Sequence, residues 1–168
     1  ADDAVKVGSR ARDLHEISVE IVAKTRATPC IRPVEGRVSS EFGYRRDPFN
    51  GYRKEYHSGL DIAAAMWEPI VASADGVVAY SGYKRGYGWT ISIEHGYGYT
   101  TLYAHCCRLK AKGGQKVARG EVIAYVGQSG SATGPHLHYE VLVSNKNVDP
   151  AGYFTNEVRE VDHSVREN

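Results

Sequence analysis

The stretch that decides the fold is Thr90-Ile-Ser-Ile-Glu-His-Gly-Tyr-Gly-Tyr-Thr-Thr-Leu-Tyr103. It holds two short runs of β-branched and aromatic residues, 90–93 and 99–103, on either side of a glycine-containing turn at 96–98. Similar runs occupy 77–80, 121–126 and 136–143. Turn signals recur about every 8–12 residues, which is typical of antiparallel β folds. We therefore predict an all-β core, an antiparallel β sandwich or open barrel with a groove.

The N-terminal segment has a different periodicity. Residues 10–27 carry Leu14, Ile17, Ile21 and Val22 at helical spacing, and prolines follow at 29 and 33. This pattern predicts a short N-terminal helix and then an extended linker. We expect three parts: helix and linker over 1–33, a β domain over 34–154, and a C-terminal tail over 155–168. The tail is charged and aperiodic, which is typical of a loose chain end.

Composition excludes several classes of partner. The formal net charge of the 168 residues is +1, so electrostatics gives no support for binding to nucleic acid or to an acidic membrane. No apolar run approaches the ~20 residues that span a bilayer. The three cysteines, Cys30, Cys106 and Cys107, are odd in number and include an adjacent pair, which does not form a disulfide framework. We expect small, buried or half-buried side chains at these positions.

Four histidines and one aspartate suggest metal chemistry. His136 and His138 alternate along a predicted strand and point to one face, although an isolated pair of this kind is also compatible with two solvent-facing histidines. His57 and Asp61 lie up to ~13 Å apart on a straight strand, so Gly59 must leave space or let the backbone bend. His105 follows the strand at 99–103. Imidazole and carboxylate donors without thiolate are typical of a catalytic zinc that keeps one position open for water.

Five sequence motifs in the β domain together resemble one known family. They are Arg37-Val-Ser-Ser-Glu-Phe-Gly43-Tyr-Arg45, His57-Ser-Gly-Leu-Asp-Ile-Ala63, Ala74-Asp-Gly-Val77, Thr101-Leu-Tyr-Ala-His105 and Gly127-Gln-Ser-Gly-Ser-Ala-Thr-Gly-Pro-His-Leu-His138. In this order they resemble the LytM/lysostaphin-type zinc metallopeptidases. The resemblance implies that one Zn²⁺ is held by His57, Asp61 and His138. It also implies that His105 and His136 are catalytic and flank the metal's water, without telling which of the two is the general base.

The resemblance also implies a substrate. It indicates an endopeptidase that hydrolyses peptide cross-links of bacterial peptidoglycan, with a preference for D,D cross-links over glycine bridges. The implied location is periplasmic or extracellular, with a membrane anchor or regulatory domain upstream of Ala1. One alternative is a non-enzymatic wall-binding or amidase-activating module of the same fold, which typically lacks the metal ligands. A carrier-type β sandwich is another, but the chain lacks the lysine at a hairpin tip that such a domain displays.

Other polar and aromatic residues have open roles. Arg45 could position a substrate carboxylate or carbonyl, or form an ordinary surface ion pair. His95 belongs to no ligand pair and is expected to lie at a strand end and turn, in a structural or surface role. The tyrosines near the motifs could line a substrate groove or only cover the sheet. They are Tyr44, Tyr56, Tyr83 and Tyr87.

Overall fold

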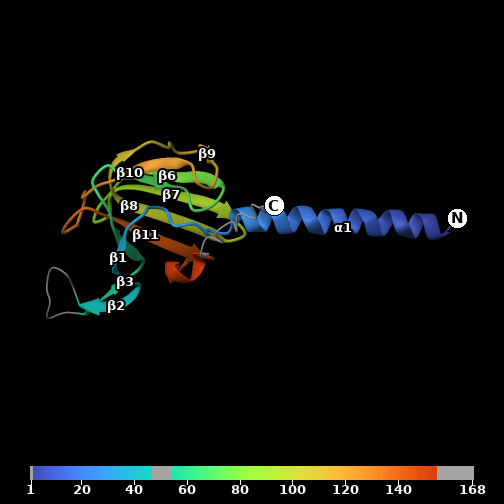
Figure 1. Cartoon of the computed structure of the whole chain (residues 1–168), viewed down its shortest axis with the longest axis horizontal. Helices are drawn as coiled ribbons and strands as arrows, with labels where there is room; N and C mark the ends of the chain where they lie inside the picture. Colours follow the sequence, from blue (N-terminus) through green and yellow to red (C-terminus); the bar gives the residue numbers. More distant parts are fainter. Residues whose placement is uncertain (1, 47–53, 155–168) are drawn as a thin grey trace, which may run out of the picture.

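A computed structural model describes residues 2–46 and 54–154, with side chains from residue 13 onward. One long helix, α1 (Asp2–Ala27), projects from a β domain (Figure 1). The strands before the central hairpin are β1 (Arg37–Ser40), β2 (Gly43–Arg46), β3 (Lys54–His57), β4 (Leu60–Ala63) and β5 (Pro69–Val71). The remaining elements are β6 (Gly76–Lys84), β7 (Gly88–Gly96), β8 (Tyr99–Leu109), β9 (Lys116–Val117), β10 (Val122–Val126), β11 (His136–Val143), β12 (Lys146–Val148) and the 3₁₀ helix η1 (Pro150–Tyr153).

The strands form an antiparallel fold, as predicted. The main sheet has the order β1-β4-β11-β8-β7-β6-β9, and β2 and β3 form a separate hairpin. The five strands predicted from the sequence correspond to β6, β7, β8, β10 and β11. The turn between β7 and β8 has positive φ at Gly96, Tyr97 and Gly98, which suits the twist of a tight hairpin.

Strand β8 changes partners along one of its edges. Its first part pairs with β11 as far as Ala104, and its last part pairs with β10 from Cys106 onward. The other edge pairs with β7 from Tyr99 to Cys106. The sheet therefore splits at β8, and the β5–β10 pair covers the core beside the main sheet. His105 lies at the split.

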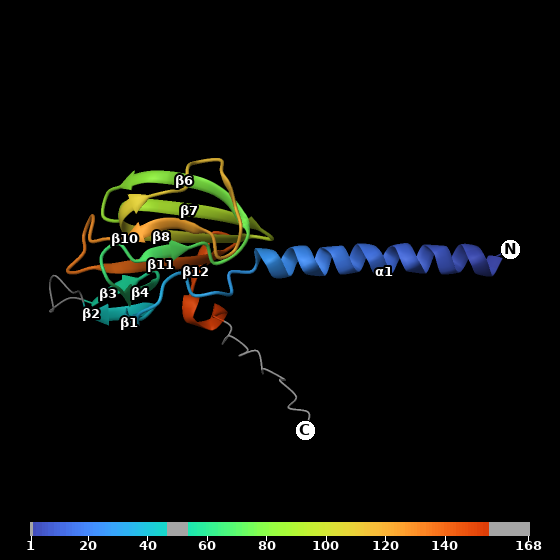
Figure 2. The same cartoon turned by 45° about the horizontal axis from the view of Figure 1, so that its top comes forward.

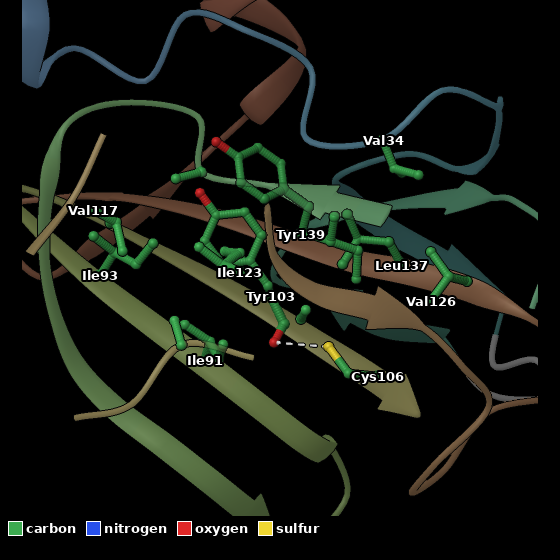
Figure 3. Close-up of a cluster of buried hydrophobic side chains, with 14 of the residues drawn as sticks. Val34, Ile91, Ile93, Tyr103, Cys106, Val117, Ile123, Val126, Leu137 and Tyr139 are labelled. Carbon is green, nitrogen blue, oxygen red and sulfur yellow. Dashed lines mark hydrogen bonds between the residues drawn. The ribbon is translucent and has the colours of Figure 1, made fainter. Parts of the chain in front are cut away.

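The core fills the space that this split encloses. Ile91, Ile93, Tyr103, Leu137 and Tyr139 are fully buried and lie together in Figure 3. The two buried tyrosine hydroxyls have polar partners, which removes the cost of burying them. These partners are Ser73 for both hydroxyls and Thr101 for Tyr103. Thr101 in turn lies 2.7 Å from Nε2 of the buried His95, which is structural, as predicted.

Helix α1 ends where the sequence predicts but begins earlier. It runs for 26 residues, so the expectation of a short helix over 10–27 is wrong at its start. The described apolar residues Leu14, Ile17, Ile21 and Val22 are each more than half exposed. The helix joins the β domain near Arg26, whose Nε donates to Asp75 at 2.5 Å, and then extends away from it (Figure 2).

Three smaller expectations concern the cysteines, two chain segments and membrane-spanning helices. Cys106 is buried and Cys30 and Cys107 are half-buried, as predicted. The turn at 47–51 and the tail at 155–168 lie outside the described residues. Among the helices described, none has the length and apolar character needed to cross a bilayer.

Candidate active site

Neighbouring strands bring the predicted ligand residues together. Asp61 of β4 and His138 of β11 are direct register partners in the sheet. His57 is the last residue of β3, and β4 begins at Leu60. The chain therefore bends between His57 and Asp61 instead of continuing as one straight strand, which would hold the two side chains far apart.

Gly59 permits this bend by leaving space beside β11. A Cβ atom at this position would lie 2.4 Å from the carbonyl oxygen of Tyr139 and 3.0 Å from Cε1 of His138. Its φ is not in the left-handed region, so the requirement for glycine is one of space. The bend expected at Gly59 is present, and the missing side chain also lets β11 approach closely.

Three potential ligand atoms converge at the site. Nε2 of His57 lies 3.0 Å from Oδ1 of Asp61 and 3.1 Å from Nδ1 of His138. Nδ1 of His138 lies 2.8 Å from the same Oδ1. Donors at ~2.0–2.1 Å from a tetrahedral zinc lie ~3.3 Å apart. The three atoms are therefore within a few tenths of an ångström of a zinc-binding arrangement, and all three residues are buried.

The opposite nitrogen of each ring is already engaged. Nδ1–H of His57 donates to the carbonyl oxygen of Glu41 at 2.7 Å, and Nε2–H of His138 donates to Oε1 of Glu140 at 3.0 Å. In its neutral form each ring then turns a lone pair toward Asp61. Two lone pairs and a carboxylate facing each other repel unless positive charge lies between them, either a metal ion or a proton on His138. The donor set thus fits a bound divalent metal, and nitrogen and oxygen donors of this kind suit zinc.

Electrostatics at the cluster also favours positive charge. Burial works against a charged His138 ring, but hydrogen bonds to Asp61 and Glu140 outweigh burial and raise the pKa of His138 to about 9. Burial likewise opposes a charged Asp61, yet hydrogen bonds with His138 and His57 lower the pKa of Asp61 well below its usual range. The protein environment therefore stabilises an anion and a cation side by side.

His136 and His105 flank the cluster with the same ring orientation. Nδ1–H of His136 donates to the carbonyl oxygen of Gly134 at 2.8 Å, and Nδ1–H of His105 donates to that of Ser129 at 2.7 Å. The two ring centroids are 4.8 Å apart. Nε2 of His136 lies 3.8 Å from Oδ1 of Asp61. In its neutral form each of these rings therefore has its lone pair on Nε2, where a proton can be accepted.

The backbone at His105 is unusual for a strand. Its φ is 61°, in the left-handed region that L-residues other than glycine rarely occupy. Trp89 pairs with Cys106 and Ile91 with Tyr103, so β8 carries one extra residue here. Such a bulge re-aims a side chain. Burial lowers the pKa of His105 to about 4, against the opposing effect of the Ser129 hydrogen bond, so the ring is neutral at neutral pH.

Arg45 contacts a predicted ligand directly. Its Nη1 lies 2.9 Å from Oδ2 of Asp61, and its Nε donates to Glu55 at 2.7 Å. Nη1 also contacts Ser40. Of the two roles considered for Arg45, the ion pair is present, but it is made with the site and not on the surface. It occupies one carboxylate oxygen of Asp61 and leaves Oδ1 to face the histidines.

Glu140 is a site residue that the sequence reasoning missed. It is buried and hydrogen-bonds to His138. A signal was present, because residues 136, 138 and 140 alternate along β11 and so share a face. The histidines and Asp61 line a groove of about 480 Å³, together with Tyr87 and with Arg45, Arg46, Glu55 and Tyr56 of the β2–β3 hairpin.

Comparisons with known proteins identify a family for the chain. A family model described as "Peptidase family M23" matches residues 55–150. The DD-carboxypeptidase/endopeptidase Mpg of Neisseria meningitidis is 46% identical over 114 residues, 68% of this chain and 26% of that protein. The peptidoglycan DD-endopeptidase ShyC of Vibrio cholerae is 43% identical over 115 residues, again 68% of this chain and 26% of that protein. The chain thus spans about a quarter of the length of the curated relatives it matches.

A solved structure has the same architecture. The crystal structure of a zinc-containing peptidase from Vibrio cholerae matches with a TM-score of 0.63 and 38% sequence identity. The match covers 70% of this chain and 37% of that one.

Proposed function

Because this chain belongs to peptidase family M23, we propose that it is a zinc-dependent endopeptidase that hydrolyses peptide cross-links of bacterial peptidoglycan. The observation that carries the proposal is the convergence of three acceptor atoms from His57, Asp61 and His138 beside an open groove. A complete donor set supports an enzyme over a non-enzymatic wall-binding or amidase-activating relative.

His57, through Nε2, Asp61, through Oδ1, and His138, through Nδ1, would hold the zinc. When bound, zinc supplies a Lewis acid that polarises the scissile carbonyl and makes a water molecule more acidic. The groove residues orient the peptide so that its carbonyl lies beside the two flanking rings, His105 and His136. One of these accepts the proton of the attacking water at Nε2 and later returns a proton to the leaving amine.

The other flanking ring has a different task. Its Nδ1–H is already used, so it must carry a second proton on Nε2, and in that charged form it donates to the carbonyl oxygen and stabilises the negative charge that develops there. His105, neutral and held by Ser129 through Nδ1, is suited to accept a proton at Nε2. His136, held by Gly134 through Nδ1, is equally well oriented to do so. The assignment between them stays open, and both are proposed as catalytic.

The proposed substrate is a D,D cross-link between stem peptides. The relatives named DD-endopeptidases, at 46% and 43% identity, support this preference over glycine bridges. A cell-wall substrate places the protein's action in the periplasm or outside the cell. We further propose that residues 34–154 form the peptidase domain and that 1–33 serve as its helical connection.

The proposal is tested with purified protein and isolated peptidoglycan sacculi. We expect release of soluble fragments that stops with a chelator and returns with added zinc, and mass spectrometry of the fragments should identify a cleaved D,D bond. His57→Ala serves as the inactive control. Binding of sacculi without zinc-dependent release of fragments would instead support the wall-binding alternative.

A further inference from the structure

Glu140 combines burial, charge and several hydrogen bonds beside the metal-binding cluster. We propose that Glu140 is a positioning residue that fixes the ring of His138 with Nδ1 toward the metal by accepting the opposite N–H. The proposal rests on the metal site described under the proposed function. It adds a residue outside the ligand set and the two flanking histidines.

The contacts of the Glu140 carboxylate define its orientation. Oε1 accepts from Nε2–H of His138 at 3.0 Å and from the hydroxyl of Tyr87 at 3.0 Å. It also accepts a hydrogen bond from Ser58. Oε2 accepts from Nδ2 of Asn147 at 3.0 Å. Both oxygens are thus held, and the side chain has no freedom to turn away from His138.

The partners of Glu140 come from separate parts of the fold. Ser58 lies in the bend between β3 and β4, Tyr87 in the turn between β6 and β7, and Asn147 in β12. The Tyr87 ring also packs edge-on against His138, with centroids 5.6 Å apart. Several elements that meet only in the folded chain therefore fix one ring orientation, which is the preorganisation a metal site requires.

The charge of Glu140 has a consequence for metal binding. A carboxylate that accepts the remote N–H of a ligand imidazole fixes its tautomer and makes its free nitrogen a better donor, and loss of such a partner typically lowers metal affinity 10–100-fold. A hydrogen-bond hub with a purely structural role would change folding stability and leave the affinity of the folded protein for metal unchanged. Metal affinity therefore separates the two roles.

The experiment measures zinc dissociation constants by chelator competition for the full chain. Glu140→Gln removes the charge and keeps the size. Glu140→Asp keeps the charge, but its carboxylate is one methylene farther from His138. Its smaller side chain makes it a second variant with less risk to folding. Glu121→Gln is the matched control, because Glu121 bonds to Gln115 and Ala118 and not to the cluster. Circular dichroism and thermal melting verify that each variant is folded.

We expect Glu140→Gln and Glu140→Asp to weaken zinc binding about 10–100-fold and to alter the visible spectrum of bound Co²⁺. Glu121→Gln should bind within about twofold of the parent chain. A folded Glu140 variant with the parent's zinc affinity and Co²⁺ spectrum would overturn the positioning role and leave the proposed function intact. If the parent chain itself binds no zinc, the proposed function fails as well.

Discussion

Replacing Gly59 by alanine tests whether close packing of β4 against β11 sets the geometry of the metal site. The added Cβ would lie 2.4 Å from the Tyr139 carbonyl oxygen, whereas real Cβ contacts essentially never fall under 3.0 Å. The strands must therefore move apart by at least 3.0 − 2.4 = 0.6 Å. The carbonyl belongs to the backbone of a strand paired on both edges, so it cannot move alone.

The size of the effect follows from this displacement. Overpacking of a close-packed interior costs ~1–3 kcal/mol, so we expect the free energy of unfolding to fall by that amount. The same Cβ lies 3.0 Å from Cε1 of His138, and a shift of 0.6 Å exceeds the ~0.5 Å within which a binding constellation must be held. If moving the ligands relieves about 1.4 kcal/mol of the strain, zinc affinity falls about tenfold.

Two measurements check the Gly59→Ala prediction. Urea unfolding with a chelator present gives the stability of the metal-free chain, and chelator competition gives the zinc dissociation constant. Gly113→Ala is the control, because a Cβ at Gly113 meets no atom within 4 Å. Equal stability and equal zinc affinity for Gly59→Ala and Gly113→Ala would refute the reasoning.

Three further predictions address separate parts of the molecule. His57→Ala should lose both zinc and activity, whereas His105→Ala should keep about one zinc per chain and lose activity; metal analysis showing an empty His105→Ala site would contradict this division. Tyr103→Phe removes a buried hydroxyl and leaves the buried groups that bond to it without that partner, so it should lower the free energy of unfolding by ~1–3 kcal/mol. The matched change at an exposed position, Tyr83→Phe, should alter the free energy of unfolding little. Burial lowers the pKa of His95 below its usual value, so stability from its neutral ring is present above about pH 6.5 and is lost as pH falls below that. The free energy of unfolding, measured with urea, should fall less from about pH 7.5 to about pH 5.5 for His95→Gln than for the parent chain.

The central strands were predictable because their signals are local. Alternating β-branched residues and glycine turns mark β6, β7, β8, β10 and β11. The short strands β1 to β5 are three or four residues long, and β2 and β3 consist largely of charged and tyrosine residues. Their pairing depends on contacts distant in sequence, which local patterns do not encode. The start of α1 was missed because residues 2–9 lack the apolar spacing that marks residues 14–22.

The candidate site shows the same division between local and distant information. The alternation of His136 and His138 was readable, and the family resemblance supplied the ligand set. The close approach of β11 to Gly59, and the contact of Arg45 with Asp61, depend on which strands become neighbours. Glu140 shared the visible alternation, but its partners Ser58 and Asn147 come together only in the folded chain.

The left-handed backbone at His105 has a consequence for protein engineering. A residue with a Cβ in this conformation costs ~1–2 kcal/mol, and glycine or asparagine relieves that cost. A library screened only for heat resistance should therefore enrich glycine or asparagine at position 105. With the catalytic role proposed for His105, such variants would be more stable and would still bind metal but would lack the proposed peptidase activity, so an effort to stabilise this fold should hold position 105 constant.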